Sequence, residues 1–375
     1  MSYDPSADRL RITEAVEKAP SIFNARPWVL RFPAADRIEL RLPHLGDLDH
    51  AQLREYTISC GAALFNLRLA IRVAGHEFAV WELPDPRHDS TLLASVEVMT
   101  GWIKKPTIEE QELYEAIWHR HTNRSPYKIV PAPIPIIVAM ESAAAEEGGW
   151  LRLLHPRQAR KWMRLAAEAD RDQAFQPPFP NHVPAANYGP PPKNLLPRTR
   201  KDFWLGDEPQ RFEHKPQLMA LSTDDDKPLD WLRAGQALQR AILTGTRYSV
   251  SAPHGLTALY HAPPKYGLPA RRHLLTRHDE LAHYGLSVSF LTQPLERDDI
   301  RAKPRRWPWR WRFPELPEMV VRVGYSAEEP PPAQRPQPDM LESQPRLPGR
   351  RVPAHRPGNL PFGGCSGILA VPGRG

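Results

Sequence analysis

The chain has 375 residues, enough for one large or two modest hydrophobic cores. It holds no run of 18 or more apolar residues, and charges are spread through its first 15 positions, so we expect neither a membrane-spanning helix nor a secretory signal. Two cysteines, Cys60 and Cys365, are too few for a disulfide framework or a cysteine-based metal site. We therefore expect a cytoplasmic protein without a membrane partner.

The formal charge of +7 raises the question of a nucleic-acid partner, because surplus Lys and Arg attract polyanions. Much of the surplus lies in Arg301–Arg312, which holds six basic residues and three Trp but no acid. A basic groove with stacking aromatics has this composition. A solvated loop whose Trp side chains pack on the domain edge has it too, and we favour the loop because such runs are unspecific.

Apolar periodicity predicts two helices and four strands before residue 106. The second helix is apolar on most of its circumference, so we expect it to be buried and central. The helices are expected over residues 8–19 and 56–74, and the strands over 28–32, 37–42, 78–83 and 92–99.

The sequence predicts further helices and strands after residue 106, together with a Pro-rich loop, an insertion and a Pro- and Arg-rich tail. Helices are expected over residues 108–119, 158–172 and 228–244, strands over 150–154 and 319–325, and an apolar segment over 284–295. Residues 176–197 are a Pro-rich loop long enough to cover a site, and 247–283 looks like an insertion. Residues 341–375 are rich in Pro and Arg, and we expect them to be disordered because they cannot bury enough surface to fold.

Arg120-His-Thr-Asn-Arg124 places two guanidinium groups and a hydroxyl within five residues, where a helix gives way to an extended segment. Two forked, permanently charged donors and a hydroxyl suit a phosphate dianion. A solvated helix end explains the same residues, since Arg is favourable near the C-terminal dipole. These residues alone leave both interpretations open.

The loop Ala19–Trp28 (APSIFNARPW) carries Ser21 and Asn24 between a helix and a strand. A hydroxyl and an amide could meet the donor-rich edge of a planar heterocycle such as an isoalloxazine. Ordinary capping and turn chemistry is the more common use of Ser and Asn. The loop is therefore not diagnostic by itself.

Taken together, several segments resemble the nitroreductase superfamily, and within it the double-length, internally duplicated Acg family. The resemblance spans about residues 9–335. The segments that carry it are APSIFNARPW (Ala19–Trp28), ISCGAALFNLRLAIRVAG (Ile58–Gly75), RHTNRSP (Arg120–Pro126), LSTDDDKPLDWLRAGQALQRAILTGT (Leu221–Thr246), GLSVSFLTQPLE (Gly285–Glu296) and MVVRVGY (Met319–Tyr325).

The resemblance implies an α+β, nitroreductase-like fold: an internally duplicated pseudo-dimer with mixed or antiparallel sheets flanked by helices. The first half would be residues 1–106 and the second 107–340, with 247–283 inserted. No residue-level repeat is visible in the sequence, and the order of elements carries the signal. Such a chain could be monomeric or could form a homodimer.

By the same resemblance, one FMN would bind between the halves. The Arg-x-Thr-x-Arg motif would hold the phosphate, and the Pro-Ser-x-x-Asn loop would meet the ring. A backbone segment would lie beside flavin N5, and a C-terminal Arg would add to the phosphate site. The predicted cofactor-binding residues are Pro20, Ser21, Asn24, Arg120, Thr122, Arg124, Pro294, Leu295, Glu296 and Arg335. Otherwise Glu296 is a surface carboxylate, and Arg335 begins the basic tail.

Two features depart from the family pattern. Arg26 stands where a neutral Gln is usual; it would stabilise a reduced ring if it reached the flavin and would do nothing if it pointed to solvent. The insertion 247–283 would act as a lid or lie outside the site.

The implied function is an FMN-dependent oxidoreductase that passes hydride from NADH or NADPH through FMN to a nitro, quinone or related small-molecule acceptor. No catalytic side chain is predicted, because the cofactor supplies the chemistry. No metal ligand is predicted, because His273, His278 and His283 are spaced five residues apart and do not align on one helical face. The alternative is a flavin-sequestering protein in which a lid covers the ring. Nucleic-acid binding through Arg301–Arg312 is the third and least favoured hypothesis.

Overall fold

The structure is a computed structural model that describes residues 5–43, 48–120, 122, 127–128, 130–173, 216–250, 286–290, 295, 298–306 and 317–325. The chain divides into two units, Met1–Arg335 and Pro336–Gly375, and all described residues lie in the first. The loop expected over 176–197, residues 251–283 of the expected insertion and the expected tail 341–375 lie outside the described residues.

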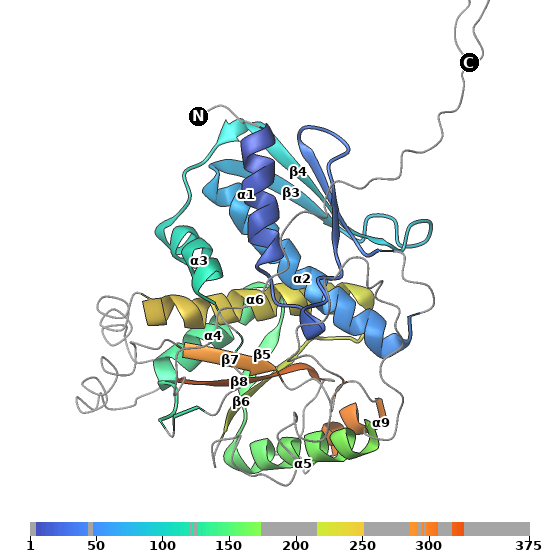
Figure 1. The fold of residues 1–375 in the computed structure, drawn as a ribbon, viewed down its shortest axis with the longest axis vertical. Helices are drawn as coiled ribbons and strands as arrows, with labels where there is room; N and C mark the ends of the chain where they lie inside the picture. Colours follow the sequence, from blue (N-terminus) through green and yellow to red (C-terminus); the bar gives the residue numbers. More distant parts are fainter. Residues whose placement is uncertain are drawn as a thin grey trace, which may run out of the picture. The chain divides into compact units, whose positions relative to one another are not determined.

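Helices and two four-stranded sheets give the first unit an α+β arrangement (Figure 1). The helices are α1 (Pro5–Glu17), α2 (His50–Val73), α3 (Ile108–His119), α4 (Ile134–Glu146), α5 (Pro156–Gln173), α6 (Pro228–Val250) and α9 (Asp298–Arg301), with 3-10 turns η1 (Ile22–Asn24) and η6 (Lys303–Arg306). The strands are β1 (Val29–Arg31), β2 (Arg37–Arg41), β3 (His76–Glu82), β4 (Leu92–Ile103), β5 (Trp150–Leu153), β6 (Gln217–Ser222), β7 (Leu286–Phe290) and β8 (Pro317–Tyr325).

The two sheets share one topology. The first has the order β1-β2-β4-β3 and the second β5-β6-β8-β7, and each pair of neighbouring strands is antiparallel. In each sheet one long helix, α2 or α6, follows the second strand and precedes the third. Among the described residues the only parallel pairing is an isolated bridge between Thr122 and Val288.

Burial alternates in the first sheet and is continuous at the centre of the second. On β2, Ile38 and Leu40 are buried and Arg37 is exposed, as expected for a sheet with one face on the core. β8 is buried at every position. Helices α5 and α6 lie on opposite sides of the second sheet (Figure 1), so both faces of this strand are covered.

Helices α2 and α6 cross with their backbones in contact at Gly61 and Gly235. A Cβ added to Gly235 would overlap the carbonyl oxygen of Ile58 and lie 2.7 Å from Gly61 Cα; one added to Gly61 would overlap the carbonyl oxygen of Leu232. Only glycine permits so close an approach. Each glycine begins a Gly-x-Ala-Leu sequence, a similarity between the halves that becomes visible once the helices are paired.

A buried amide pair reinforces this crossing. Gln239 of α6 donates from Nε2 to Asn66 Oδ1 of α2 at 2.7 Å, and Asn66 Nδ2 donates to the carbonyl of Ala15 at the same distance. Both side chains are fully buried, so an axial shift of one helix would leave polar groups unpaired in the core. The pair thereby fixes the register of α1, α2 and α6.

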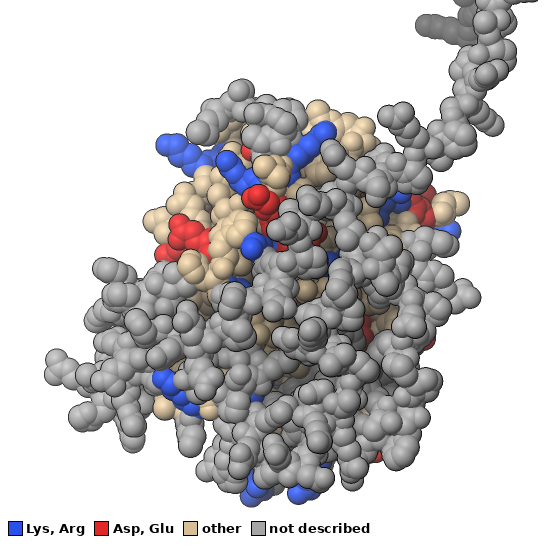
Figure 2. Space-filling view, in the orientation of Figure 1, with Lys and Arg blue, Asp and Glu red and all other residues tan. Residues whose placement is uncertain are grey.

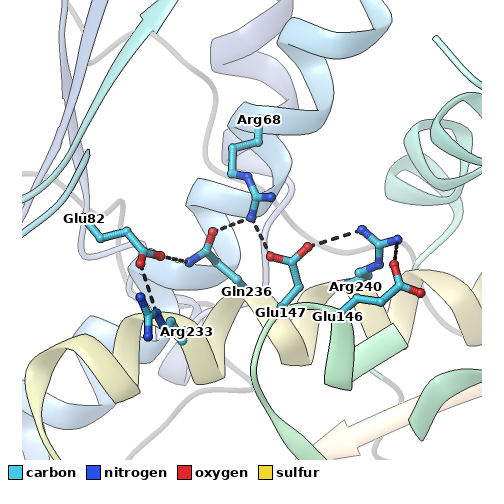
Figure 3. Close-up of polar contacts among 7 residues, drawn as sticks. All are labelled: Arg68, Glu82, Glu146, Glu147, Arg233, Gln236 and Arg240. Atoms are coloured by element: carbon cyan, nitrogen blue, oxygen red, sulfur yellow. Dashed lines mark hydrogen bonds and ion pairs between the residues drawn. The ribbon is translucent and has the colours of Figure 1, made fainter. Parts of the chain in front are cut away.

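A chain of ion pairs runs beside the crossing (Figure 3). Glu147 shares its carboxylate between Arg68 at 2.6 Å and Arg240 at 3.3 Å. Gln236 accepts from Arg68 and donates to Glu82, at 2.6 and 2.7 Å. The full set, from α2, the end of β3, the end of α4 and α6, is Arg68, Glu82, Glu146, Glu147, Arg233, Gln236 and Arg240.

Sequence periodicity missed α4, β6 and the short helical elements α9, η1 and η6. Three prolines at 131, 133 and 135 obscure the start of α4, although Pro is tolerated in the first helical turn. β6 is a six-residue apolar run, too short for periodicity to separate strand from helix. In addition, α2 begins earlier than expected, because Asp49 and Gln52 form a capping box, and α6 continues to Val250, into the expected insertion.

The described charges do not gather into a basic groove on the face drawn in Figure 2, where basic and acidic side chains lie among one another over α1 and α3. Two basic residues from the Arg301–Arg312 segment are paired internally: Arg301 with Asp226 and Glu318, and Lys303 with Glu168. The Trp residues of the segment lie outside the described residues. No described helix has the length and apolar character needed to cross a bilayer.

Candidate functional site

Arg120 lies where α3 ends, and its side chain reaches the segment that follows α1. Its backbone turns from helical to extended geometry, and its side chain is buried. Nη1 donates to Thr122 Oγ1 at 3.2 Å, and Nη2 donates to the carbonyl of Lys18 at 3.3 Å. Thr122 itself is exposed and pairs with Val288 of β7. A fixed guanidinium thus lies beside an accessible hydroxyl.

The carbonyl that Arg120 holds belongs to the entry of the Ser21 loop. Pro20, two residues after Lys18, is buried and lies beyond the end of α1, and Ser21 is the N-cap residue of η1, with extended backbone geometry. Asn24 is exposed with a positive φ of 58°, a conformation that Asn adopts more readily than most residues. The loop therefore presents its amide outward from a fixed backbone.

Arg26 neither points to solvent nor is free to swing. Its Nη1 pairs with Glu17 at 2.9 Å, and its backbone N–H donates to Ser21 Oγ at 3.0 Å. Its φ is +48°, a strained value for a non-glycine residue that these two contacts maintain. Nε and Nη2 are buried and have no hydrogen-bond partner among the described residues. These contacts exclude the alternative in which Arg26 points to solvent.

Helix α2 holds the Ser21 loop in place. Ser59 Oγ accepts from the backbone N–H of Ile22 at 3.2 Å and donates to the carbonyl of Glu55 at 2.8 Å. One residue on, the Cys60 thiol donates to the carbonyl of Pro27 at 2.9 Å. Burial raises the pKa of this thiol well above its ordinary value, so it acts as a neutral donor.

The same helix also contacts the segment predicted to lie beside the flavin. Arg54, one turn before Ser59 and fully buried, donates from Nη2 to the carbonyl of Leu295. Leu295 is itself buried in the core beneath the second sheet. Within about two turns, α2 therefore touches both the Ser21 loop and Leu295, which lie far apart in the sequence.

A buried cluster of charges continues from Arg54. Arg301 pairs with Asp226 at 2.6 Å and with Glu318 at 2.9 Å, and donates to the carbonyl of Pro317. Burial raises the pKa of Glu318 to about 7, against the attraction of Arg301 and Arg54. Burial also disfavours charge on Asp226, but hydrogen bonds from Arg301 and Trp231 outweigh it, so the Asp226 pKa is lowered.

Another buried arginine, Arg322, lies on β8. The Arg322 guanidinium stacks 3.7 Å from the centre of the Tyr127 ring, and its Nε donates to Ser289 Oγ of β7 at 2.9 Å. Gly324 leaves room for the same ring, because a Cβ there would lie 3.0 Å from Tyr127 Cγ. These contacts anchor the chain just after the Arg120–Thr122 segment.

Six of the ten predicted site residues are described: Pro20, Ser21, Asn24, Arg120, Thr122 and Leu295. The structure brings Arg120 and Thr122 to the entry of the Ser21 loop, and connects Leu295 to that loop through α2. Arg124, Pro294, Glu296 and Arg335 lie outside the described residues.

Sequence reasoning did not single out Arg54, Ser59 or Arg322. The available signal was a polar side chain inside a strongly apolar element, since buried charges are rarely tolerated without partners. Arg322 interrupts the apolar run of β8, and Arg54 precedes the apolar stretch of α2. Their partners could not be named, because Leu295 is 241 residues away from Arg54.

The donor set at Arg120 suits an acceptor-rich anion rather than a metal. Arg120 and Thr122 present N–H and O–H groups, which fit the phosphate of FMN. In the described part of the chain, no group of three or more His, Cys, Asp or Glu could hold a metal ion.

Comparison with known proteins places the chain among distant relatives. No protein-family model matches it. It is 26% identical, over 353 residues and 87% of each chain, to "Putative NAD(P)H nitroreductase Rv3131" of Mycobacterium tuberculosis strain H37Rv and to its counterpart MT3217 of strain CDC 1551. It is 25% identical over 253 residues to "Uncharacterized protein Rv3127" of strain H37Rv, covering 61% of this chain and 72% of that protein. The similarity along most of the chain supports a place in the nitroreductase superfamily.

Proposed function

We propose that the chain is an FMN-dependent oxidoreductase that uses NADH or NADPH to reduce a nitro, quinone or related small-molecule acceptor. When bound, FMN would supply the redox chemistry, and the protein would supply binding, orientation and electrostatics. The relative named as an NAD(P)H nitroreductase and the α+β fold with antiparallel sheets support this assignment. No side chain needs to act as a general acid or base.

Each described site residue has a definite role in this proposal. Arg120 and Thr122 bind the phosphate, which the guanidinium meets as a preoriented, permanently charged fork. Ser21 and Asn24 orient the ring, with the loop held by Ser59. The proposal extends to four residues outside the described part of the chain: Arg124 and Arg335 at the phosphate, and Pro294 and Glu296 flanking Leu295 beside N5.

The observation that carries the proposal is the hydrogen bond from Arg120 to the carbonyl of Lys18. It joins residues 102 positions apart and puts the proposed phosphate donor at the entry of the proposed ring-binding loop. A composite flavin site requires this juxtaposition. A solvated helix end does not, because Arg near a helix dipole gains little from burial against a distant loop.

We infer further that the chain is an internally duplicated pseudo-dimer, with halves at residues 1–106 and 107–340. The shared strand topology, the α2–α6 crossing and the repeated Gly-x-Ala-Leu support a duplication. One FMN per chain is expected. Light scattering on the purified protein would distinguish a monomer from a further homodimer.

Spectroscopy tests the cofactor assignment directly. The purified protein should show flavin absorption or gain it with added FMN, and Arg120→Lys should weaken FMN binding about 10- to 100-fold, because a point charge cannot make both hydrogen bonds. Arg157→Lys, at an exposed position on α5, is the matched control and should bind FMN normally. A colourless protein that rejects FMN would overturn the assignment.

Turnover needs its own measurement. Anaerobic stopped-flow mixing with NADH and NADPH should bleach the bound flavin, and an acceptor should restore its colour. A protein that holds FMN tightly but is not reduced on the timescale of seconds would be a flavin-sequestering protein instead.

A further inference from the structure

We propose that Arg54 is a positioning residue, which fixes the backbone at Leu295 from the opposite half of the chain. The functional consequence, control of how the flavin is presented to its reductant, rests on the proposed function. The position of the backbone at Leu295 does not depend on the proposed function.

The first observation is that Arg54 is wholly buried and contacts the carbonyl of Leu295. It is among the largest fully buried side chains of the described residues, and its Nη2 donates to the carbonyl of Leu295. Burial and the nearby charge of Arg301 lower its pKa, so the site keeps this cation at a cost. Packing alone would be served better by an apolar side chain.

The second observation is that the backbone held by Arg54 is fixed again six residues later. Arg301, the last residue of α9, is also buried and contacts three acceptors: Asp226, Glu318 and the carbonyl of Pro317. Leu295 and α9 are thereby attached at two points, one to α2 in the first half and one to β8 in the second. A segment with two such anchors has little freedom to shift.

The third observation is that Arg54 and Arg301 share one buried cluster with the same acids. Arg54 and Arg301 face Asp226 and Glu318, and Thr223 donates to Glu318 at 3.4 Å. Both arginines lie beside the same acids, so each arginine depends on the arrangement of the other. Arg54 and Arg301 therefore act as one network of charged side chains rather than as separate salt bridges.

The fourth observation is the neighbourhood of Arg54 on its own helix. Ser59, which anchors the Ser21 loop, lies five residues along α2. One rigid helix thus sets the distance between the Ser21 loop and Leu295, which the proposed function places on the flavin. A change at Arg54 would alter the presentation of the ring while leaving Arg120 and the phosphate contacts intact.

The test uses the full-length chain and three variants: Arg54→Gln, Arg54→Lys and the control Arg68→Gln. Arg68 lies on the same helix and also pairs across to the second half, with Glu147, but does not contact Leu295. Amide hydrogen exchange at residues 295–301, normalised to β2, measures the backbone directly and needs no flavin. Arg54→Gln should speed this exchange about tenfold, Arg54→Lys should restore part of the protection, and Arg68→Gln should leave it unchanged.

The flavin readouts follow on the same proteins. In Arg54→Gln the Kd for FMN should change less than about threefold, while reduction by NAD(P)H should slow about tenfold and the midpoint potential should shift; Arg54→Lys should recover part of the rate. If the wild-type protein bound no FMN, the proposed function would fail and hydrogen exchange would still decide the positioning role.

Unchanged exchange at 295–301 in both Arg54 variants, or equal acceleration in Arg68→Gln, would overturn the inference. Should Arg54→Gln fail to fold by circular dichroism, Arg54→Lys decides the matter: it keeps the charge but not the fork, and exchange must still rise above the wild-type value.

Discussion

The buried residue Glu318 makes the stability of the protein depend on pH. Its carboxyl is buried on β8, and burial raises its pKa from 4.5 to about 7 although Arg301 and Arg54 oppose the shift. Between these two values the native state binds a proton that the unfolded chain has released. Stability from this group is therefore fully present below about pH 4.5 and is lost as pH rises through about 7.

We expect the free energy of unfolding to fall on the order of 2 kcal/mol between pH 5 and pH 8 through Glu318 alone. Urea denaturation at both values should reveal this slope in the wild type and a flatter one in Glu318→Gln. Glu115→Gln, at an exposed position on α3, controls for the loss of a surface carboxylate. Equal slopes in the wild type and Glu318→Gln would contradict the linkage.

At the residue scale, local chemistry marks some site residues and hides others. Arg120 and Thr122 stand out because donors are concentrated within a few positions, and the structure joins them by a hydrogen bond. Arg54 cannot be found this way, because its importance comes from a carbonyl supplied by a distant segment. For Arg26, the sequence shows an unexpected cation, but its pairing with Glu17 depends on the loop conformation.

At the scale of elements, the crossing of α2 and α6 depends on two glycines, Gly61 and Gly235, which have no side chain. Alanine usually stabilises a helix relative to glycine by about 1 kcal/mol. At Gly235 a Cβ would meet backbone atoms of Ile58, Gly61 and Ala62, which cannot move without separating the helices. The steric cost of an added Cβ should therefore exceed the gain in helix propensity.

Gly235→Ala and Gly61→Ala should each lower the free energy of unfolding by about 1–3 kcal/mol, measured by denaturant titration. Gly245→Ala, in the same helix α6, is the matched control: its added Cβ would meet only the tips of Leu286 and Met140, which can shift. We expect its cost to be clearly smaller. A stabilised Gly235→Ala protein would mean that the helices do not meet as closely as described.

Elements with strong periodicity could be predicted, and those defined by their surroundings could not. The hairpin β1–β2 and helix α3 match their predicted spans closely, because alternation and capping are local properties. β6 was missed although it lies at the centre of the second sheet, since its identity as a strand comes from pairing with β5 and β8. The partner strands of a six-residue apolar segment cannot be read from its sequence.

For the whole molecule, each core contains residues from the helix of the other half. Leu232 and Leu243 of α6 belong to the core beneath the first sheet, and Ile58 of α2 belongs to the core beneath the second. The halves are thus connected through shared apolar packing as well as through Asn66 and Gln239. We infer that neither core is complete alone.

The two sheets should therefore unfold together. Ile38→Ala, in the first core, should cost about 2–5 kcal/mol, and should lower the denaturation midpoint of β6 and β8 as well as that of β2. Hydrogen exchange during denaturant titration resolves the strands separately. Val320→Ala in β8 is the reciprocal control and should weaken β2. Independent midpoints for the two sheets would contradict the coupling.

The contact between Gly61 and Gly235 also shows where the likeness of the two halves stops. Aligning the helices at these glycines sets Arg54 of α2 opposite Pro228 of α6, a residue that has no side-chain or backbone N–H to donate. The strand order is repeated, but among the described residues the contact that holds Leu295 is found once. Under the proposed duplication, an ancestor with two equivalent sites would have kept the architecture of both and the chemistry of one.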